Sequence, residues 1–184
     1  MSKPRRTLLL SLALLSAVGF SLLAAPGLEG LFGAFLGGLM LAIAVIDADR
    51  YIIPNELTGA AVALALLRAG VVGADADWYA VLWAAFRATA VTVPLLALMI
   101  LYRRWRGRDG LGLGDIKLAA VAGSWLGMVT IFAVIEFAAL AALAAYGINA
   151  TLRKRPLRAS AFLPFGLFLA PAIWIGWLVE ARWN

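Results

Sequence analysis

Two aspartates stand at the ends of apolar segments, where side chains of this type could do chemistry. Asp47 ends one apolar run and Asp115 opens another. Two carboxylates that lie close together do not both ionise easily, so one of them keeps a proton. Such a pair can activate water: the ionised carboxylate takes the water's proton, while the protonated carboxyl hydrogen-bonds to the carbonyl under attack. Hydrolysis of a peptide bond is therefore one chemistry that these residues could perform.

Each aspartate also has a simpler explanation. An aspartate at a helix N-terminus caps the helix and complements its dipole, and Asp115 could do only that. Asp47 could be an interfacial residue at the end of a helix. Asp49 is a rival to Asp47 as the catalytic acid, although its position two residues later puts it on a different helix face, nearer water. Pro54 and Asn55 follow in a loop that starts the next helix, where proline suits the first turn or the turn before it.

Glycines and a lysine surround the second aspartate. Gly112 and Gly114 lack a Cβ, so the backbone could bend sharply there and a substrate strand could come close. The glycine-rich stretch after Arg108 could bind such a strand along its edge. Lys117, two residues after Asp115, could form a local salt bridge or contact lipid headgroups.

The composition limits which chemistries are available. Of the 184 residues, 64% are hydrophobic and 14% are charged, and the mean hydropathy is +0.95. Soluble domains carry about a quarter charged residues, so this composition predicts a polytopic membrane protein. The sequence contains neither cysteine nor histidine, which excludes disulfides, thiol nucleophiles, zinc–cysteine sites and Ser–His pairs. Acid–base chemistry must come from carboxylates, lysines or tyrosines, and we expect no metal and no cofactor.

Apolar segments of membrane-spanning length predict an all-α bundle of about seven transmembrane helices. They cover residues 7–25, 30–47, 56–73, 78–102, 113–127, 128–149 and 161–180. With a cytoplasmic N-terminus, this number of spans places the strongly basic stretches KPRR, RRWRGRDG and RKRPLR on the cytoplasmic side, together with Asp47 and Asp115. The segment 113–127 is short for a span, and without it RKRPLR would lie on the opposite side.

This topology accounts for the net charge of +6, so we expect contact with membrane lipids and none with nucleic acid. Residues 1–25 could also be a cleaved signal peptide, but Pro26 directly after Ala25 makes a poor cleavage site, and we expect a retained first helix. Small residues at four-residue spacing, such as Gly33 and Gly37, predict close helix packing in lipid.

Two more charged residues lie within apolar segments. We expect Glu136 to face the bundle interior beside a polar partner, and Arg87 to reach the outer surface or to pair within the bundle. A small ion- or proton-coupled transporter would use Asp47, Asp115 and Glu136 as ion sites near the middle of the membrane. A non-catalytic scaffold would tolerate Asp-to-Asn changes at both aspartates.

Three segments resemble the signatures of the type IV prepilin peptidases. IDADRYIIPNELT, residues 46–58, is similar to the first signature, in which an aspartate is followed seven residues later by proline and then Asp or Asn. GLGDIKLAA, residues 112–120, is similar to the second, which is GxGD with a lysine two residues on. LPFGLFLAP, residues 163–171, is similar to the C-terminal Pro-Phe-Gly segment, and all three occur in the family's order.

The resemblance implies an intramembrane aspartic endopeptidase of the bacterial cytoplasmic membrane, which cleaves the basic leader of prepilins or pseudopilins at the cytoplasmic face. By position, Asp47 and Asp115 are the catalytic pair. The motif or substrate-positioning residues are Gly112, Gly114, Pro54, Asn55 and Lys117. Contact with the pilus-assembly machinery is also implied.

The bifunctional members of that family carry an N-terminal cytoplasmic domain with cysteine pairs, and they also methylate the new N-terminus. A chain without cysteine resembles the short form that serves Flp/Tad-type pili, so methyltransferase activity is not expected. On this basis we expect residues 1–28 to form an N-terminal transmembrane helix and residues 29–184 to form a GxGD-type peptidase membrane domain of six helices.

Overall fold

Helix is the only regular structure in the part of the chain that the computed structural model describes, which is residues 3–72, 77–107, 110, 112–154 and 163–183. The helices within these residues are α1 (Lys3–Ala24), α2 (Leu28–Arg50), α3 (Asn55–Val71), α4 (Trp78–Arg106), α5 (Leu113–Trp125), α6 (Met128–Leu152) and α7 (Gly166–Trp183). The predicted all-α fold is confirmed. The fourth helix runs four residues beyond the predicted end at residue 102 because arginine favours helix, and it stops where Gly107 adopts a left-handed conformation (φ 64°).

Four of the helices, α1, α2, α4 and α6, are each long and apolar enough to cross a membrane. The 13-residue α5 measures only about 20 Å, short of a hydrocarbon core of about 30 Å. It lies inside the bundle, where it contacts α3, α4, α6 and α7, and most of its residues are buried. The fold is therefore that of a polytopic helical membrane protein, with a short inner helix at the predicted fifth segment.

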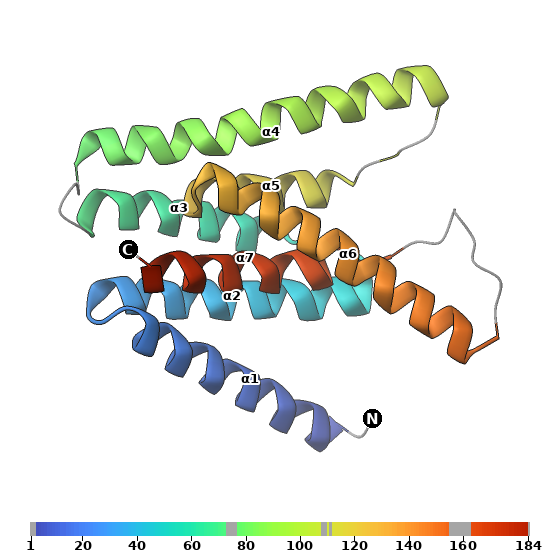
Figure 1. Ribbon diagram of the computed structural model, residues 1–184, viewed down its shortest axis with the longest axis horizontal. Helices are drawn as coiled ribbons and strands as arrows, with labels where there is room; N and C mark the ends of the chain where they lie inside the picture. Colours follow the sequence, from blue (N-terminus) through green and yellow to red (C-terminus); the bar gives the residue numbers. More distant parts are fainter. Residues whose placement is uncertain (1–2, 73–76, 108–109, 111, 155–162, 184) are drawn as a thin grey trace.

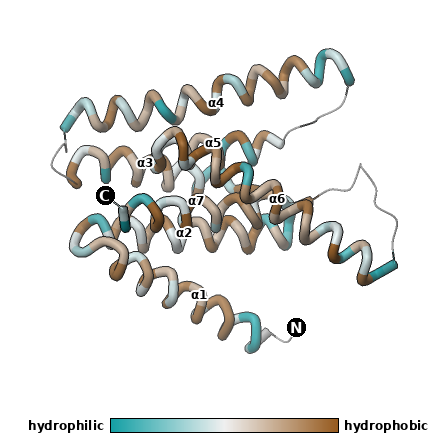
Figure 2. Tube along the Cα trace, in the orientation of Figure 1, coloured by the Kyte–Doolittle hydropathy of each residue, from teal (hydrophilic) through white to brown (hydrophobic). Residues whose placement is uncertain are grey.

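Successive helices run in opposite directions, so the last turns of α2, α4 and α6 share one end of the bundle with the first turns of α3, α5 and α7 (Figure 1). We call this the basic end. Figure 2 shows hydrophilic residues there at the start of α1 and at the last turns of α4 and α6. Its basic residues include Arg5, Arg6, Arg50, Arg103, Arg104, Arg106, Arg153 and Lys154. Both Asp47, near the end of α2, and Asp115, near the start of α5, belong to the basic end.

Glycines let α2 pack closely against its neighbours. A Cβ on Gly33 would overlap the indole ring of Trp177 in α7, and a Cβ on Gly37 would lie 2.9 Å from Trp174 Nε1. Trp177 is almost completely buried. Lipid tails are as apolar as the side chains, so helices in a membrane associate largely through such close contact. The close packing predicted from the small-residue spacing is confirmed.

An ion pair joins helices at the opposite end of the bundle. Arg68 Nη2 of α3 lies 2.6 Å from Glu29 Oε1 of α2, and Arg68 Nε donates to the same carboxylate at 2.8 Å. Glu29 Oε1 also accepts a hydrogen bond from Trp177 Nε1 at 3.0 Å. The Arg68 guanidinium stacks over the ring of Trp125, 5.4 Å from its centroid. This network connects α2, α3, α5 and α7.

Arg68→Met is expected to lower the free energy of unfolding by about 3 kcal/mol, because Glu29 then loses its cation in a mostly buried site. The matched control is Arg6→Met, which breaks the ion pair between Arg6 and Asp49, whose side chains are 45% and 46% exposed. An exposed pair contributes only about 0–1 kcal/mol. Denaturant titration in detergent micelles measures both changes. Equal losses would mean that the Arg68 network adds no particular stability.

Candidate active site

The carboxylate of Asp47 is held by a helix other than its own. Asp47 lies one turn before the end of α2 and is only 5% exposed. Helix α2 stops because Tyr51 takes the left-handed conformation (φ 56°), with its N–H donating to the Asp47 carbonyl. The Asp47 side-chain Oδ2 accepts a hydrogen bond from the backbone N–H of Leu167, in the first turn of α7, at 3.0 Å. The start of α7 therefore orients this carboxylate.

Asp115 lies in the first turn of α5 and is half-buried. Gly112 is the N-cap residue, and its carbonyl accepts from the Asp115 N–H at 3.1 Å. This position suits an acidic side chain, because the first turn of a helix carries partial positive charge. A contribution to helix stability and a chemical role are compatible here.

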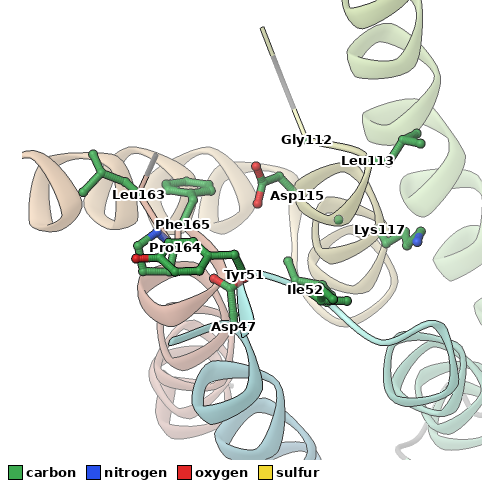
Figure 3. A pocket seen from close by; sticks show the side chains of 12 residues that line it. Asp47, Tyr51, Ile52, Gly112, Leu113, Asp115, Lys117, Leu163, Pro164 and Phe165 are labelled. Carbon is green, nitrogen blue, oxygen red and sulfur yellow. The ribbon is translucent and has the colours of Figure 1, made fainter. Parts of the chain in front are cut away.

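The two carboxylates line the same cavity, which has a volume of about 350 Å³ (Figure 3). Its walls come from the end of α2, the connection to α3, the first turns of α5, and residues 163–165 before α7. Apolar side chains such as Ile52 and Phe165 supply much of the lining. Residues that are 68 positions apart in the sequence thus line one cavity at the basic end, and a catalytic pair must share a site in this way.

Asp49 is outside this cavity. Its side chain is exposed and forms an ion pair with Arg6 of α1. Because residues two apart on a helix point about 200° away from each other, the burial of Asp47 directs Asp49 outward. The structure therefore brings Asp47, and not its rival, together with Asp115.

Both motif glycines have little room for a side chain, and neither adopts a backbone conformation that requires glycine. Gly112 has φ −73°, which any residue can adopt, and Gly114 is helical, so the expected sharp bend is wrong. A Cβ on Gly114 would lie 3.0 Å from Ile53 Cδ1, and a Cβ on Gly112 would lie 3.1 Å from Asp115 Oδ2. Arg108 lies outside the described residues, and strand binding beside it stays a prediction.

Lys117 and Asn55 meet although they are 62 positions apart: the Lys117 ammonium donates a hydrogen bond to Asn55 Oδ1. This contact joins α5 to the first residue of α3, where the sequence suggested a salt bridge or lipid contact. Figure 3 shows the ammonium pointing away from the two carboxylates. Pro54 is the N-cap residue of α3, as expected, and its carbonyl accepts from Thr58 Oγ1 at 3.2 Å.

The start of α7 and Ile53 had no assigned role in the sequence patterns. A Cβ on Gly166 would lie 2.9 Å from both Asp47 Oδ2 and Ile53 Cδ1. The Ile53 side chain, only 7% exposed, therefore fills the space between two glycines, Gly114 of α5 and Gly166 of α7. The sequence did contain a signal for Gly166: it directly follows Pro164 and Phe165 in the segment 163–171, which resembles the family's Pro-Phe-Gly segment.

Glu136 and Arg87 do not line the cavity. Glu136 is exposed on α6, so the expectation that it faces the bundle interior is wrong. Among the described helices, α6 packs mainly against α7 and α5, which leaves most of the α6 surface facing outward. The Arg87 Nε donates to the Gly123 carbonyl of α5 at 3.3 Å. Of the two predictions for Arg87, this contact fits pairing within the bundle. A transport site built from Asp47, Asp115 and Glu136 is thus not assembled.

Comparisons with known proteins place the chain beside one family. The sequence profile of the type IV leader peptidase family matches residues 34–148. A protein of Burkholderia pseudomallei named prepilin leader peptidase/N-methyltransferase is 37% identical over 164 residues, which cover 84% of this chain and 48% of that protein. Proteins of the same name from Aeromonas salmonicida and Xanthomonas campestris are 32% and 31% identical, over 90% and 81% of this chain and 55% and 50% of their own lengths. The chain thus spans about half the length of these curated relatives. No solved structure gives a significant match.

Proposed function

Because the chain belongs to the type IV leader peptidase family, we propose that it is an aspartic endopeptidase that removes the short basic leader of type IV prepilins and pseudopilins, with Flp-like prepilins as its substrates. The observation that carries this proposal is the shared cavity of Asp47 and Asp115 at the basic end of the bundle. The proposal covers cleavage of the peptide bond and does not include methyl transfer.

The reaction uses a water molecule placed between the two carboxyl groups. The ionised carboxylate takes a proton from this water as the water oxygen bonds to the carbonyl carbon of the leader's last residue. The protonated carboxyl donates a hydrogen bond to the carbonyl oxygen. The C–N bond then breaks, the amine leaves with a proton from the pair, and the pair is left with one proton. The substrate must be extended at this bond, because carbonyls inside a helix are already hydrogen-bonded.

We place the basic end of the bundle in the cytoplasm, because cytoplasmic loops are enriched in Lys and Arg. The membrane is then the bacterial cytoplasmic membrane. The apolar helix of a prepilin lies in the bilayer beside the bundle, and its leader stays in the cytoplasm. The bond between leader and helix falls at the interface, at the depth of the cavity.

A cleavage assay tests this function. The protein is co-expressed with a Flp-type prepilin, and mass spectrometry follows the loss of the leader. We expect a single cut between the basic leader and the apolar helix. A folded, membrane-inserted protein that cuts neither Flp-like nor other prepilins would contradict the proposal.

Lys117→Ala and Asn55→Ala are each expected to slow cleavage about tenfold, because each removes the same link between α5 and α3. One hydrogen bond to a charged group contributes about 1.5 kcal/mol, and a tenfold change corresponds to about 1.4 kcal/mol. The double variant should be no slower than either single variant, which a double-mutant cycle of initial rates measures. A much larger loss for Lys117→Ala alone would instead mean that the ammonium acts on the substrate.

A further inference from the structure

The two carboxylates of the cavity differ in the groups that hold them. Asp47, which is 5% exposed, lies in α2 and accepts a hydrogen bond from the Leu167 N–H of α7. The first backbone N–H groups of a helix have no partner within it and carry partial positive charge. Helix α7 begins at Gly166, and the N–H of its second residue, Leu167, donates both to the Asp47 carboxylate at 3.0 Å and to the Pro164 carbonyl at 3.2 Å. Asp115 is half-buried and lies in the first turn of its own helix, whereas Asp47 accepts its hydrogen bond from the start of a second helix.

The approach of α7 to Asp47 depends on the absence of a side chain at residue 166. A Cβ there would lie 2.9 Å from Asp47 Oδ2, closer than real Cβ atoms approach, and 3.0 Å from Asp47 Cγ. The same Cβ would lie 2.9 Å from Ile53 Cδ1. Any side chain at this position must therefore push the first turn of α7 away from the carboxylate, away from Ile53, or both.

Ile53 connects this contact to the second aspartate. Its side chain packs against Gly166 in α7 and against Gly114 in α5, where a Cβ on either glycine would lie. Gly114 directly precedes Asp115 in the sequence. One buried isoleucine thus sets the separation between the helix start that holds Asp47 and the helix start that carries Asp115. Close packing transmits small changes of volume to neighbouring groups.

We propose that Gly166 and Ile53 are positioning residues, and that the start of α7 holds Asp47 as the ionised member of the pair. Asp47 then takes the proton from water, and Asp115 carries the proton that hydrogen-bonds to the substrate carbonyl. This assignment rests on the proposed peptidase function. Among the residues that the structure describes, the other titratable groups lining the cavity are Tyr51 and Lys117. Arg6 of α1 is paired with Asp49 outside it.

The kinetic test compares Gly166→Ala with Gly59→Ala. A Cβ on Gly59, in α3, meets no atom within 4 Å, so this control adds a methyl group without a contact. We expect Gly166→Ala to lower kcat about 100-fold, as displacements of about 1 Å do, with KM changed less than about threefold. The acidic limb of its kcat profile should move to higher pH, because Asp47 without the Leu167 N–H takes up a proton at higher pH. Ile53→Val is a milder substitution, and we expect this variant to fold. It should also lower kcat and move the acidic limb of the kcat profile to higher pH.

A second measurement needs no substrate. Infrared spectra of the protein labelled with ¹³C-aspartate follow the protonation of one cavity carboxyl at a time, in the Asp115→Asn or the Asp47→Asn background. We expect Asp47 to take up its proton at lower pH than Asp115. Adding Gly166→Ala should raise the pH of protonation of Asp47 more than that of Asp115.

The outcomes separate the inference from the function. Wild-type kcat and an unchanged pH profile in Gly166→Ala would overturn the positioning role while the peptidase function stands. Infrared spectra in which Asp115 loses its proton at lower pH than Asp47 would reverse the assignment of base and acid. A wild type that cuts no prepilin would overturn the peptidase function. The infrared comparison would then still decide whether the start of α7 holds Asp47 ionised.

Discussion

Asp47→Asn and Asp115→Asn are each expected to slow leader cleavage by about 10³- to 10⁴-fold, the loss usual for a missing catalytic acid or base. Asparagine keeps the size of the side chain but can neither take the proton of water nor carry the shared proton. Because both carboxylates line one cavity, the chemistry fails when either is replaced. Initial rates with a purified prepilin, followed by mass spectrometry, measure the effect. The double variant should be about as slow as each single variant, since the pair acts as a unit.

Asp49→Asn is the matched control in the same helix. Its exposed side chain pairs with Arg6 and lies outside the cavity, so cleavage should stay within about threefold of wild type, consistent with the small contribution of exposed ion pairs. Thermal unfolding of all three variants should confirm that they remain folded. An inactive Asp49→Asn beside an active Asp47→Asn would reverse the assignment of the first aspartate.

Gly33→Ala is expected to destabilise the protein by about 3 kcal/mol, at the upper end of the usual range for overpacking a core. The added methyl group would overlap the buried Trp177 ring, so α2 and α7 must separate. These are the helices that supply Asp47 and the backbone N–H that binds it, and cleavage should fall together with stability. Denaturation in detergent micelles and the cleavage rate measure the two effects.

Gly38→Ala provides the control within α2. Its Cβ would lie 3.6 Å from Leu14 Cδ1, an ordinary contact, and stability should change by less than about 0.5 kcal/mol. Trp177→Leu removes the overlapping ring, so the double variant Gly33→Ala/Trp177→Leu should be more stable than the sum of the two single changes implies. Strictly additive losses would show that the Gly33–Trp177 contact is not the cause.

Local patterns predicted the helices, and their alternation predicted where the aspartates lie. Each span is a run of apolar residues long enough to be recognised without its neighbours. Antiparallel order then brings the ends of α2 and α5 that carry Asp47 and Asp115 to the same end of the bundle as most basic residues. The small residues of α2 likewise predicted close packing, since only a surface without side chains allows helices in lipid to approach.

The contacts between helices could not be read in the same way. The hydrogen bond from Leu167 to Asp47, the place of Ile53 between two glycines, and the exposed position of Glu136 all depend on how each helix is rotated about its axis. In a soluble protein an apolar stripe reveals that rotation. Here lipid and protein interior are equally apolar, so the sequence carries no such stripe. The sequence by itself determined which helices form and at which end the two carboxylates lie. Only tertiary packing decided which backbone groups and side chains surround those carboxylates.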